Sequence, residues 1–433
     1  MSTSSTITPD QMKDLKKHLQ TAVDVELSTI PIYLYTYYSI LRVPTDTKGL
    51  SEDKVVELTT FANKLGGIVM SVAVEEMLHL SLSSNILRAL GGEPQIYGRS
   101  PGSYPTNLEH HSSGFSVGLC KMSIEQLDKF IAIEKPAPAK EDAQKDNWDT
   151  LGQFYEYIQT LVEKTGEGDY SNHESQLSPG KGYYAVNNVD TIYPKSANYV
   201  EGTVDKNDPS KRDADAAVYP NNDDSGGLIQ IRTKADAIKA IKEISEQGEG
   251  FRDSTTHKED NKYNDEDSHW YKFKALHDDF VKLDLDEADK KRFIFQSPDN
   301  PVTSKYPEKY QSIVKLSDAV YSYLLWMTQK SFELQGHAQS SMFYIGMHKG
   351  MIFILDKILG DMRYNTYTDA QGKTCNLAPS FENYMFAGEA SAKNELVKLA
   401  KDAHTAGLLS PVILERIQDL PDVHVVDNKV SFA

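Results

Sequence analysis

Residues 73–80 read Ala73-Val-Glu-Glu-Met-Leu-His-Leu80, inside a long run of helix-forming residues. Glu76 and His79 are three positions apart, so in a helix their side chains project from the same face. That face is otherwise apolar from Leu65 to Leu90, with the three-and-four spacing of a buried stripe. A buried carboxylate and a buried imidazole are unfavourable unless an opposite charge compensates them. The stretch therefore predicts a helical bundle with a charged partner inside it.

The composition of the chain excludes several classes of protein. It has 433 residues and a formal net charge of −17, which argues against nucleic acid and anionic membranes as main partners. Cys120 and Cys375 are too few for a disulfide framework. The first residues carry no basic, apolar signal, and no uninterrupted apolar run reaches membrane-spanning length. We expect a soluble, cytoplasmic protein; homo-oligomerisation stays open.

Capping signals divide the chain into helices. Thr8-Pro9-Asp10-Gln11 is a capping box that begins a helix running to about Ile40, and Pro31 is expected to bend this helix just beyond Glu26. Leu228 to Arg232 could form one short strand. Further helices are predicted at about 51–90, 123–133, 150–164, 233–248, 266–280, 308–332 and 337–359. The fold class is therefore mainly α.

Two packing units are predicted from this order of helices and from the length of the chain. Residues 1–285 would form a metal-binding bundle with long crossover loops and a loop-rich excursion at 166–224. Residues 286–433 would form a C-terminal helical extension that packs on the bundle.

The same combination of ligand-type residues occurs twice along the chain. Glu26 lies on the apolar stripe of the first helix, and Glu76 with His79 lies on that of the second. In the helix predicted at 233–248, a stripe of Ile238, Ile241 and Ser245 ends at Glu249. Glu266 and His269 begin the stripe of the helix that follows. In helical bundles, carboxylates and imidazoles in this arrangement hold two iron or manganese ions. The predicted ligands of two Fe ions, with Mn as the alternative metal, are Glu26, Glu76, His79, Glu249, Glu266 and His269.

Other readings stay open for single positions. An inward Glu beside a helix kink often bonds a tyrosine or a free carbonyl, and a lone Glu-x-x-His occurs by chance. Glu156 and Glu246 fall off the apolar stripes of their helices, yet either could replace Glu249 or Glu266 as a ligand. Glu75 points about 100° away from Glu76 on an ideal helix, which favours an outer contact or the surface. Packing is the first reading of Tyr33, Tyr35 and Tyr37, with pocket lining or electron relay as the alternative.

Several short motifs occur in an order that resembles one known family. They are Leu27-Ser-Thr-Ile-Pro-Ile-Tyr-Leu34 after Glu26, Glu75-Glu-Met-Leu-His-Leu80, Asn85-Ile-Leu-Arg-Ala-Leu-Gly-Gly92, Phe130-Ile-Ala-Ile-Glu-Lys-Pro136, Gly152-Gln-Phe-Tyr-Glu156, Glu246-Gln-Gly-Glu-Gly250, Ser268-His-Trp-Tyr-Lys-Phe273 and Ala378-Pro-Ser-Phe-Glu382. Together they resemble the ferritin-like domain of the iminophenyl-pyruvate dimer synthase family of violacein and rebeccamycin biosynthesis. The resemblance implies a ferritin-like helical bundle with a carboxylate-bridged metal site on the six predicted ligands. The segment 166–224 and Trp270 depart from the family pattern, so the substrate is not carried over.

Three functions are compatible with this sequence. The first is a non-haem di-iron oxidoreductase that uses O2 on a small organic, amino-acid-derived substrate. The second is an iron-binding, ferroxidase-type protein that has no organic substrate. The third, which the resemblance implies, is a biosynthetic enzyme that dimerises imino acids.

Overall fold

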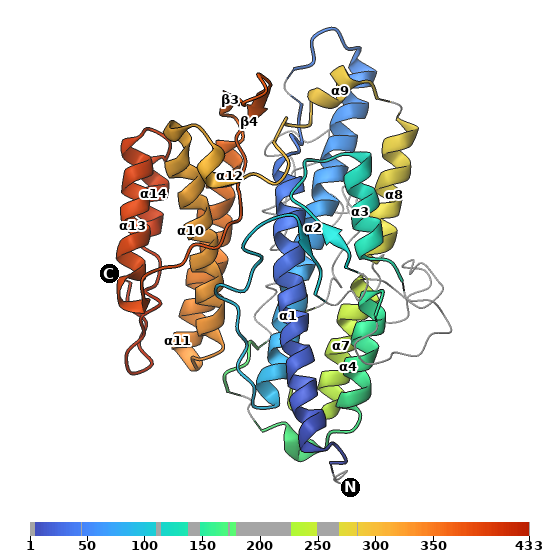
Figure 1. Cartoon of the computed structure of the whole chain (residues 1–433), viewed down its shortest axis with the longest axis vertical. Coiled ribbons are helices and arrows are strands. Elements are labelled where there is room, and N and C mark those ends of the chain that lie inside the picture. Colours follow the sequence, from blue (N-terminus) through green and yellow to red (C-terminus); the bar gives the residue numbers. More distant parts are fainter. Residues whose placement is uncertain are drawn as a thin grey trace, which may run out of the picture.

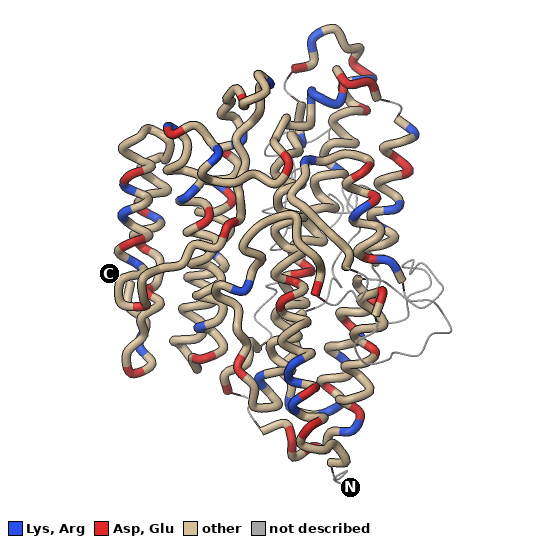
Figure 2. Tube along the Cα trace, in the orientation of Figure 1, with Lys and Arg blue, Asp and Glu red and all other residues tan. Residues whose placement is uncertain are grey.

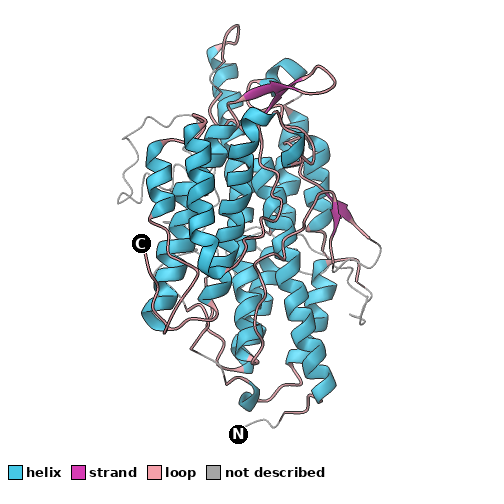
Figure 3. Ribbon diagram, turned by 60° about the vertical axis from the view of Figure 1, so that its left-hand side comes forward, coloured by secondary structure: helices cyan, strands magenta, loops and turns pink. Residues whose placement is uncertain are grey.

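Helices build almost the whole of the structure, a computed structural model that describes residues 5–44, 46–109, 114–136, 148–171, 174–178, 227–248, 268–283 and 285–432. Strands in these ranges form two short antiparallel hairpins at the periphery (Figure 3). These pair β1 (Thr106–Asn107) with β2 (Ser116–Val117) and β3 (Thr366–Thr368) with β4 (Thr374–Asn376). The predicted mainly α fold class is confirmed.

The two longest bundle helices, α1 (Pro9–Tyr38) and α2 (Glu52–Ala89), pack against each other along the middle of the molecule (Figure 1). Both begin where the capping signals predict. Thr8 and Gln11 exchange the reciprocal bonds of a capping box, and the Ser51 side chain accepts from the amide of Lys54. Gly91, at φ 75°, follows the end of α2 in the left-handed conformation that favours glycine.

Pro31 lies inside α1, and the helix continues on both sides of it. Proline has no N–H, so the carbonyl of Leu27, four residues earlier, lacks its helical donor. The Ser100 hydroxyl donates to this oxygen at 3.2 Å, and the Tyr104 hydroxyl donates to the neighbouring carbonyl of Ser28 at 3.1 Å. The crossover chain after α2 thus supplies the hydrogen bonds that the proline removes.

The other two sides of the bundle are each built from a pair of shorter helices. α3 (Ile124–Ile133) and α4 (Leu151–Val162) follow one another along one side, and α7 (Lys234–Gly248) and α8 (His269–Lys282) along the other (Figure 1). α3 packs on α8, and α4 packs on α7. The bundle therefore has two helices that run through its middle and two sides that are interrupted there.

The C-terminal helices lie beside the bundle, with α10 (Glu308–Ser331) packed on α13 (Glu389–Thr405) (Figure 1). The remaining elements are short. They are η1 (Glu167–Asp169), α9 (Glu287–Lys291), η2 (Thr303–Lys305), α11 (Gly336–Ser340), η3 (Ser341–His348), η4 (Met351–Leu355), α12 (Asp356–Met362) and α14 (Pro411–Gln418).

Two local predictions were wrong. The segment predicted as one α-helix over 337–359 is π-helical in η3 and η4, because its backbone bonds shift there from four to five residues. Leu228–Arg232 does not form a strand. The Asn85 amide donates to the carbonyl of Ile229, and the Gln176 side chain bonds both the N–H and the C=O of Ile231, so side chains replace a partner strand.

Helix α2 is long and apolar enough to cross a membrane by length and composition, but 94% of its most apolar window is buried inside the structure. It is therefore the core helix of the bundle. Charged residues gather mainly on the outer helices and helix ends, yet acidic residues also interrupt the middle of the bundle (Figure 2).

Asp318 of α10 is a buried acid whose titration should change the stability of the protein. Its carboxylate accepts hydrogen bonds from Thr303 and Ser380, but burial dominates and raises its pKa to about 7. The folded state then binds more protons than the unfolded state between about pH 4 and pH 7, so stability falls as pH rises through that interval. Asp318→Asn should reduce this fall by the part that Asp318 contributes, as measured by urea unfolding at pH 5 and pH 8. Asp278→Asn, at an exposed site, is the control; an unchanged pH dependence in Asp318→Asn would contradict the assignment.

Candidate metal centre

Five acidic and imidazole side chains converge in the middle of the bundle, where the two interrupted sides meet. Glu26 comes from α1, and Glu76 and His79 come from α2. Glu134 is the residue that ends α3, and His269 is the first residue of α8. All five side chains are buried, with at most 2% of each residue exposed. Charged groups of this kind need a compensating partner in the interior.

The five residues form two groups that share Glu76. Glu26, Glu76 and His79 make the first group, and Glu76, Glu134 and His269 make the second; within each, the ligand atoms lie within 4.8 Å of one another. The Oε1 atom of Glu76 lies 3.4 Å from Nδ1 of His79 and 3.2 Å from Nδ1 of His269. Donor atoms that share one cation at about 2.1 Å lie roughly 3 to 4 Å apart, so these separations suit metal binding.

The outer nitrogen of each imidazole is held by a hydrogen bond. Nε2 of His79 lies 3.0 Å from the amide oxygen of Gln247, and Nε2 of His269 lies 2.6 Å from the carboxylate of Glu75. An oxygen acceptor at Nε2 places the proton there and leaves the Nδ1 lone pair facing the centre. Both imidazoles thus present the same nitrogen to the space beside Glu76.

The group that accepts the hydrogen bond from Nε2 of His269 is a carboxylate, whereas the group that accepts from Nε2 of His79 is a neutral amide. Glu75 accepts a bond from Ser71 at 3.0 Å and two from the buried ammonium of Lys272 at 2.9 and 3.2 Å. A carboxylate behind a ligating histidine fixes the ring and increases its basicity. Two ions held by these groups would therefore have chemically different surroundings.

Hydroxyl groups hold the carboxylates of the centre. Thr29 donates to Oε2 of Glu76 at 2.7 Å, and Tyr155 donates to Oε1 of Glu26 at 3.0 Å. Tyr33 donates to Oε1 of Glu134. Each bond fixes one carboxylate oxygen and leaves the other for a cation.

Proximity changes the proton affinities of the centre. Burial, and then repulsion from Glu76, raise the pKa of Glu26 well above its usual range. Burial alone would also raise the pKa of Glu76, but the adjacent imidazoles of His269 and His79 lower it well below that range. Burial disfavours the charged form of His269, yet Glu134, Glu75 and Glu76 raise its pKa well above 6.5. Protons therefore occupy positions that a cation would take, and metal binding should release them.

Two buried polar atoms without hydrogen-bond partners indicate a place for a cation. Nδ1 of His269 and Oε2 of Glu134 have no hydrogen-bond partner, although they lie 3.6 Å apart. Glu134 also stands at the C-terminal end of α3, where the helix dipole disfavours a negative charge unless a cation is near. Oxygen and imidazole donors suit iron, manganese and zinc, so the residues present fit a pair of divalent ions.

The structure brings together four of the six predicted ligands: Glu26, Glu76, His79 and His269. Glu249 and Glu266 lie outside the described residues. Sequence reasoning missed Glu134, although an acidic residue four positions after the buried Phe130, at a helix C-terminus, was a usable signal. Sequence reasoning also assigned the wrong buried face to α7.

The buried face of α7 is formed by Ala237, Ala240, Ile241, Ile244 and Gln247, not by the stripe through Ile238 and Ser245. Small alanines allow close packing on α2 and α4, and this rotation directs Gln247 to His79. Among the described residues, Glu156 and Glu246 join neither metal-type group. Glu246 is half-buried, and burial raises its pKa to about 7.

The neighbouring predictions have mixed outcomes. Glu75 was predicted to make an outer contact or to lie at the surface; it makes the outer contact, by bonding Nε2 of His269. Tyr33 packs on Phe130 and Phe273 while bonding Glu134. By contrast, Tyr35 bonds the carbonyl of Pro298, and Tyr37 packs edge-on against Tyr38.

Removing the Glu75 carboxylate should lower the metal affinity of the group containing His269 more than that of the group containing His79. We expect Glu75→Gln, combined with Lys272→Met so that no ammonium faces a neutral amide, to weaken the ion on His269 by about 10- to 100-fold. The ion on His79 should change less, because its support is Gln247. A stepwise metal titration of the variant measures both. Ser71→Ala, which removes one neutral bond to Glu75, is the control. An equal loss of metal affinity for both ions would contradict the predicted difference between them.

Comparison with known proteins agrees with this architecture. A sequence model of the ferritin-like family matches residues 19–278, which is more than half of the chain and includes all five residues of the centre. Among solved structures, a ferritin-like protein from Caulobacter vibrioides is similar at 17% identity and a TM-score of 0.46, over 80% of this chain and 94% of that one. No curated protein matches the chain. With a family match over most of the bundle and the carboxylates and histidines at its middle, the chain belongs to the ferritin-like family.

Proposed function

We propose that the protein is a non-haem di-metal oxidoreductase that uses two iron ions and O2 to act on a small organic substrate. The observation that supports this function is the pair of buried ligand groups sharing Glu76, with both imidazoles presenting Nδ1 to the same space. Carboxylate-bridged pairs of iron or manganese ions are held in this way in helical bundles.

The described residues divide between two ions. Glu26 and His79 would hold one, Glu134 and His269 the other, and Glu76 would bridge them. Two divalent ions carry a charge of +4, and three carboxylates contribute −3, so one further acid would make the centre neutral. We propose Glu249 or Glu266 as that fourth carboxylate. Manganese is the alternative metal, because it accepts the same oxygen and nitrogen donors.

Iron ions bound here would supply electrons to O2, and the protein would control access and protons. Burial of the five ligands excludes bulk water from the centre. Gln247 and Glu75 orient the imidazoles, while Thr29, Tyr33 and Tyr155 orient the carboxylates. In the absence of metal, a proton on the Glu26 carboxyl relieves its repulsion from Glu76.

The departures from the family pattern at 166–224 and Trp270 leave the substrate open. We propose 2-imino and 2-oxo acids as the first class of compound to test, because the resembling biosynthetic family acts on imino acids. Dimerisation of imino acids and oxidation of iron without any organic substrate are the rival functions.

Anaerobic titration with Fe(II), followed by exposure to O2, tests this proposal. We expect about two Fe(II) per chain, an O2-dependent absorbance change, and faster O2 consumption when a 2-imino acid is present. Uptake of many iron ions per chain, with no effect of organic acids, would favour the ferroxidase function. Failure to bind any divalent metal would overturn the proposal.

A further inference from the structure

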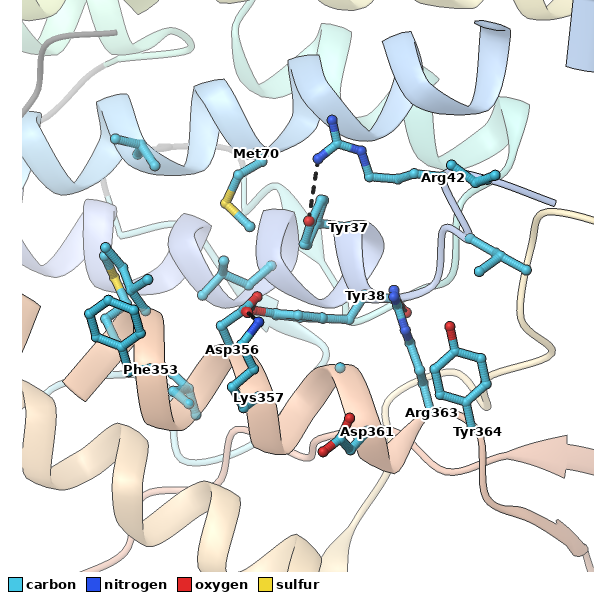
Figure 4. A pocket seen from close by; sticks show the side chains of 18 of the residues that line it. Tyr37, Tyr38, Arg42, Met70, Phe353, Asp356, Lys357, Asp361, Arg363 and Tyr364 are labelled. Atoms are coloured by element: carbon cyan, nitrogen blue, oxygen red, sulfur yellow. Dashed lines mark hydrogen bonds and ion pairs between the residues drawn. The ribbon is translucent and has the colours of Figure 1, made fainter. Parts of the chain in front are cut away.

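A cavity of about 660 Å³ lies between the α1–α2 pair and the segment made by η4 and α12 (Figure 4). Pockets for small molecules commonly enclose about 300 to 1,000 Å³, so the size suits a ligand of that kind. The cavity shares no residue with the metal centre. On α2 its wall includes Val74, two positions before Glu76 and therefore roughly 200° away around the helix. It is a separate site.

Apolar side chains form the wall and the rim of the cavity. Leu34, Met70 and Val74 form part of the buried wall. Val43, Phe353 and Tyr364 line it as well, although 52%, 44% and 59% of these residues are exposed. Exposed apolar groups that gather at one place mark a binding surface more often than scattered ones do.

The π-helical segment η4 supplies one side of the cavity, through residues that include Met351 and Phe353. A π-helix has weaker backbone geometry than an α-helix and is found frequently at functional sites. The unusual backbone and the exposed apolar rim are independent observations, and both fall on the same cavity.

Arg363 gives the cavity an uncompensated positive charge. Its guanidinium donates to the carbonyl oxygens of Tyr38 and Ile40 at 3.4 and 2.9 Å, and it lies 5.6 Å from the centre of the Tyr364 ring. These groups are neutral, and no carboxylate of the described residues forms an ion pair with Arg363. Figure 4 shows Arg363 and Tyr364 side by side at one end of the cavity.

The acidic residues of the lining do not cancel this charge. Asp356 accepts a bond from the Tyr38 hydroxyl at 2.9 Å and pairs with Lys357 at 3.1 Å. Asp361 is exposed to solvent. At Arg363 the lining therefore favours an anion.

We propose that this cavity binds a small amphipathic carboxylate, with its hydrocarbon part against Met70 and Val74 and its carboxylate at Arg363. A guanidinium recognises a carboxylate by charge-assisted hydrogen bonds. The site operates independently of the metal centre, so its test does not depend on the proposed oxidoreductase activity.

Calorimetric titration of the full chain with octanoate, octanamide and octylamine tests the chemistry. These probes have the same chain and differ in the charge of the head group. We expect octanoate to bind one site per chain, octanamide to bind at least about tenfold more weakly, and octylamine more weakly still. Failure of octanoate to bind, or equal binding of octanamide, would overturn the proposal.

Two variants with matched controls test the location. Arg363→Met keeps the apolar stem and should weaken octanoate at least about tenfold without affecting octanamide. Arg292→Met is its control, because Arg292 also donates to two backbone carbonyls, those of Asp46 and Lys48, outside the cavity.

Gly360 lines the cavity, and a Cβ there meets no atom within 4 Å, so Gly360→Phe is the substitution chosen to add a bulky ring at the cavity wall. It should abolish binding of octanoate and of octanamide together. Gly102→Phe, at an equally open glycine outside the cavity, should leave both unchanged. Full octanoate affinity in Gly360→Phe would overturn the location even if Arg363→Met failed to fold.

Discussion

Glu76→Ala is expected to remove both metal ions from the protein, reducing metal content from about two ions per chain to nearly none. Glu76 is the residue that both ligand groups share, and its Oε1 atom faces Nδ1 of both histidines. Replacing Glu26 or Glu134 removes a ligand from one group, whereas replacing Glu76 removes one from each. Elemental analysis of protein loaded anaerobically with Fe(II) measures the effect.

The control for this substitution is Glu156→Ala, on α4. Glu156 is a half-buried acid of the same bundle that lies in neither ligand group. This variant should keep both ions. If Glu76→Ala retained a full complement of metal, the assignment of the shared ligand would be wrong.

Removing metal from the native protein is expected to lower its free energy of unfolding by about 4 kcal/mol for each bound ion, and so by roughly 8 kcal/mol for two, if free metal is held near 1,000 times the dissociation constant of each site. Without a cation the buried carboxylates are unfavourable, since burial, and then repulsion from Glu76, raise the pKa of Glu26. Thermal unfolding with and without a chelator measures the difference, which should grow with metal concentration. Glu76→Ala should be insensitive to the chelator, and a similar loss of stability in that variant would contradict the prediction.

The stabilisation by metal should weaken as the solution becomes more acidic. His269 must be neutral at Nδ1 to bind a cation, and its pKa is raised well above 6.5 by the surrounding carboxylates. Protons therefore compete with metal below that raised pKa, and the competition increases as pH falls. The same chelator experiment at pH 8 and pH 5.5 should give the larger difference at pH 8.

Long helices with strong end signals were predictable from the sequence. α1 and α2 begin at a capping box and at a serine cap, and their apolar stripes continue for many turns. That periodicity was enough to place Glu26, Glu76 and His79 on inward faces. The second Glu-x-x-His spacing, at Glu266 and His269, extended the prediction to His269.

Short elements near the centre were not predictable in the same way. α7 has alanines on its buried face, so hydrophobicity alone did not identify which side faces α2. Glu134 follows the last residue of a ten-residue helix, where periodicity has too few turns to decide the direction of a side chain. The π-helical turns of η3 and η4 require a change of hydrogen-bond register that composition does not reveal.

The interruption of two sides of the bundle has a consequence for how such a protein can diversify. α3 ends at Glu134 and α8 begins at His269, while the first turns of α4 carry Tyr155 and the last turn of α7 carries Gln247. Both chain connections thus start and finish beside the candidate metal centre. A change in the length of either connection would alter the chain next to this centre and leave the register of α1 and α2 unchanged. Related chains could therefore vary the surroundings of the centre through these two connections, while inheriting the same pair of continuous helices.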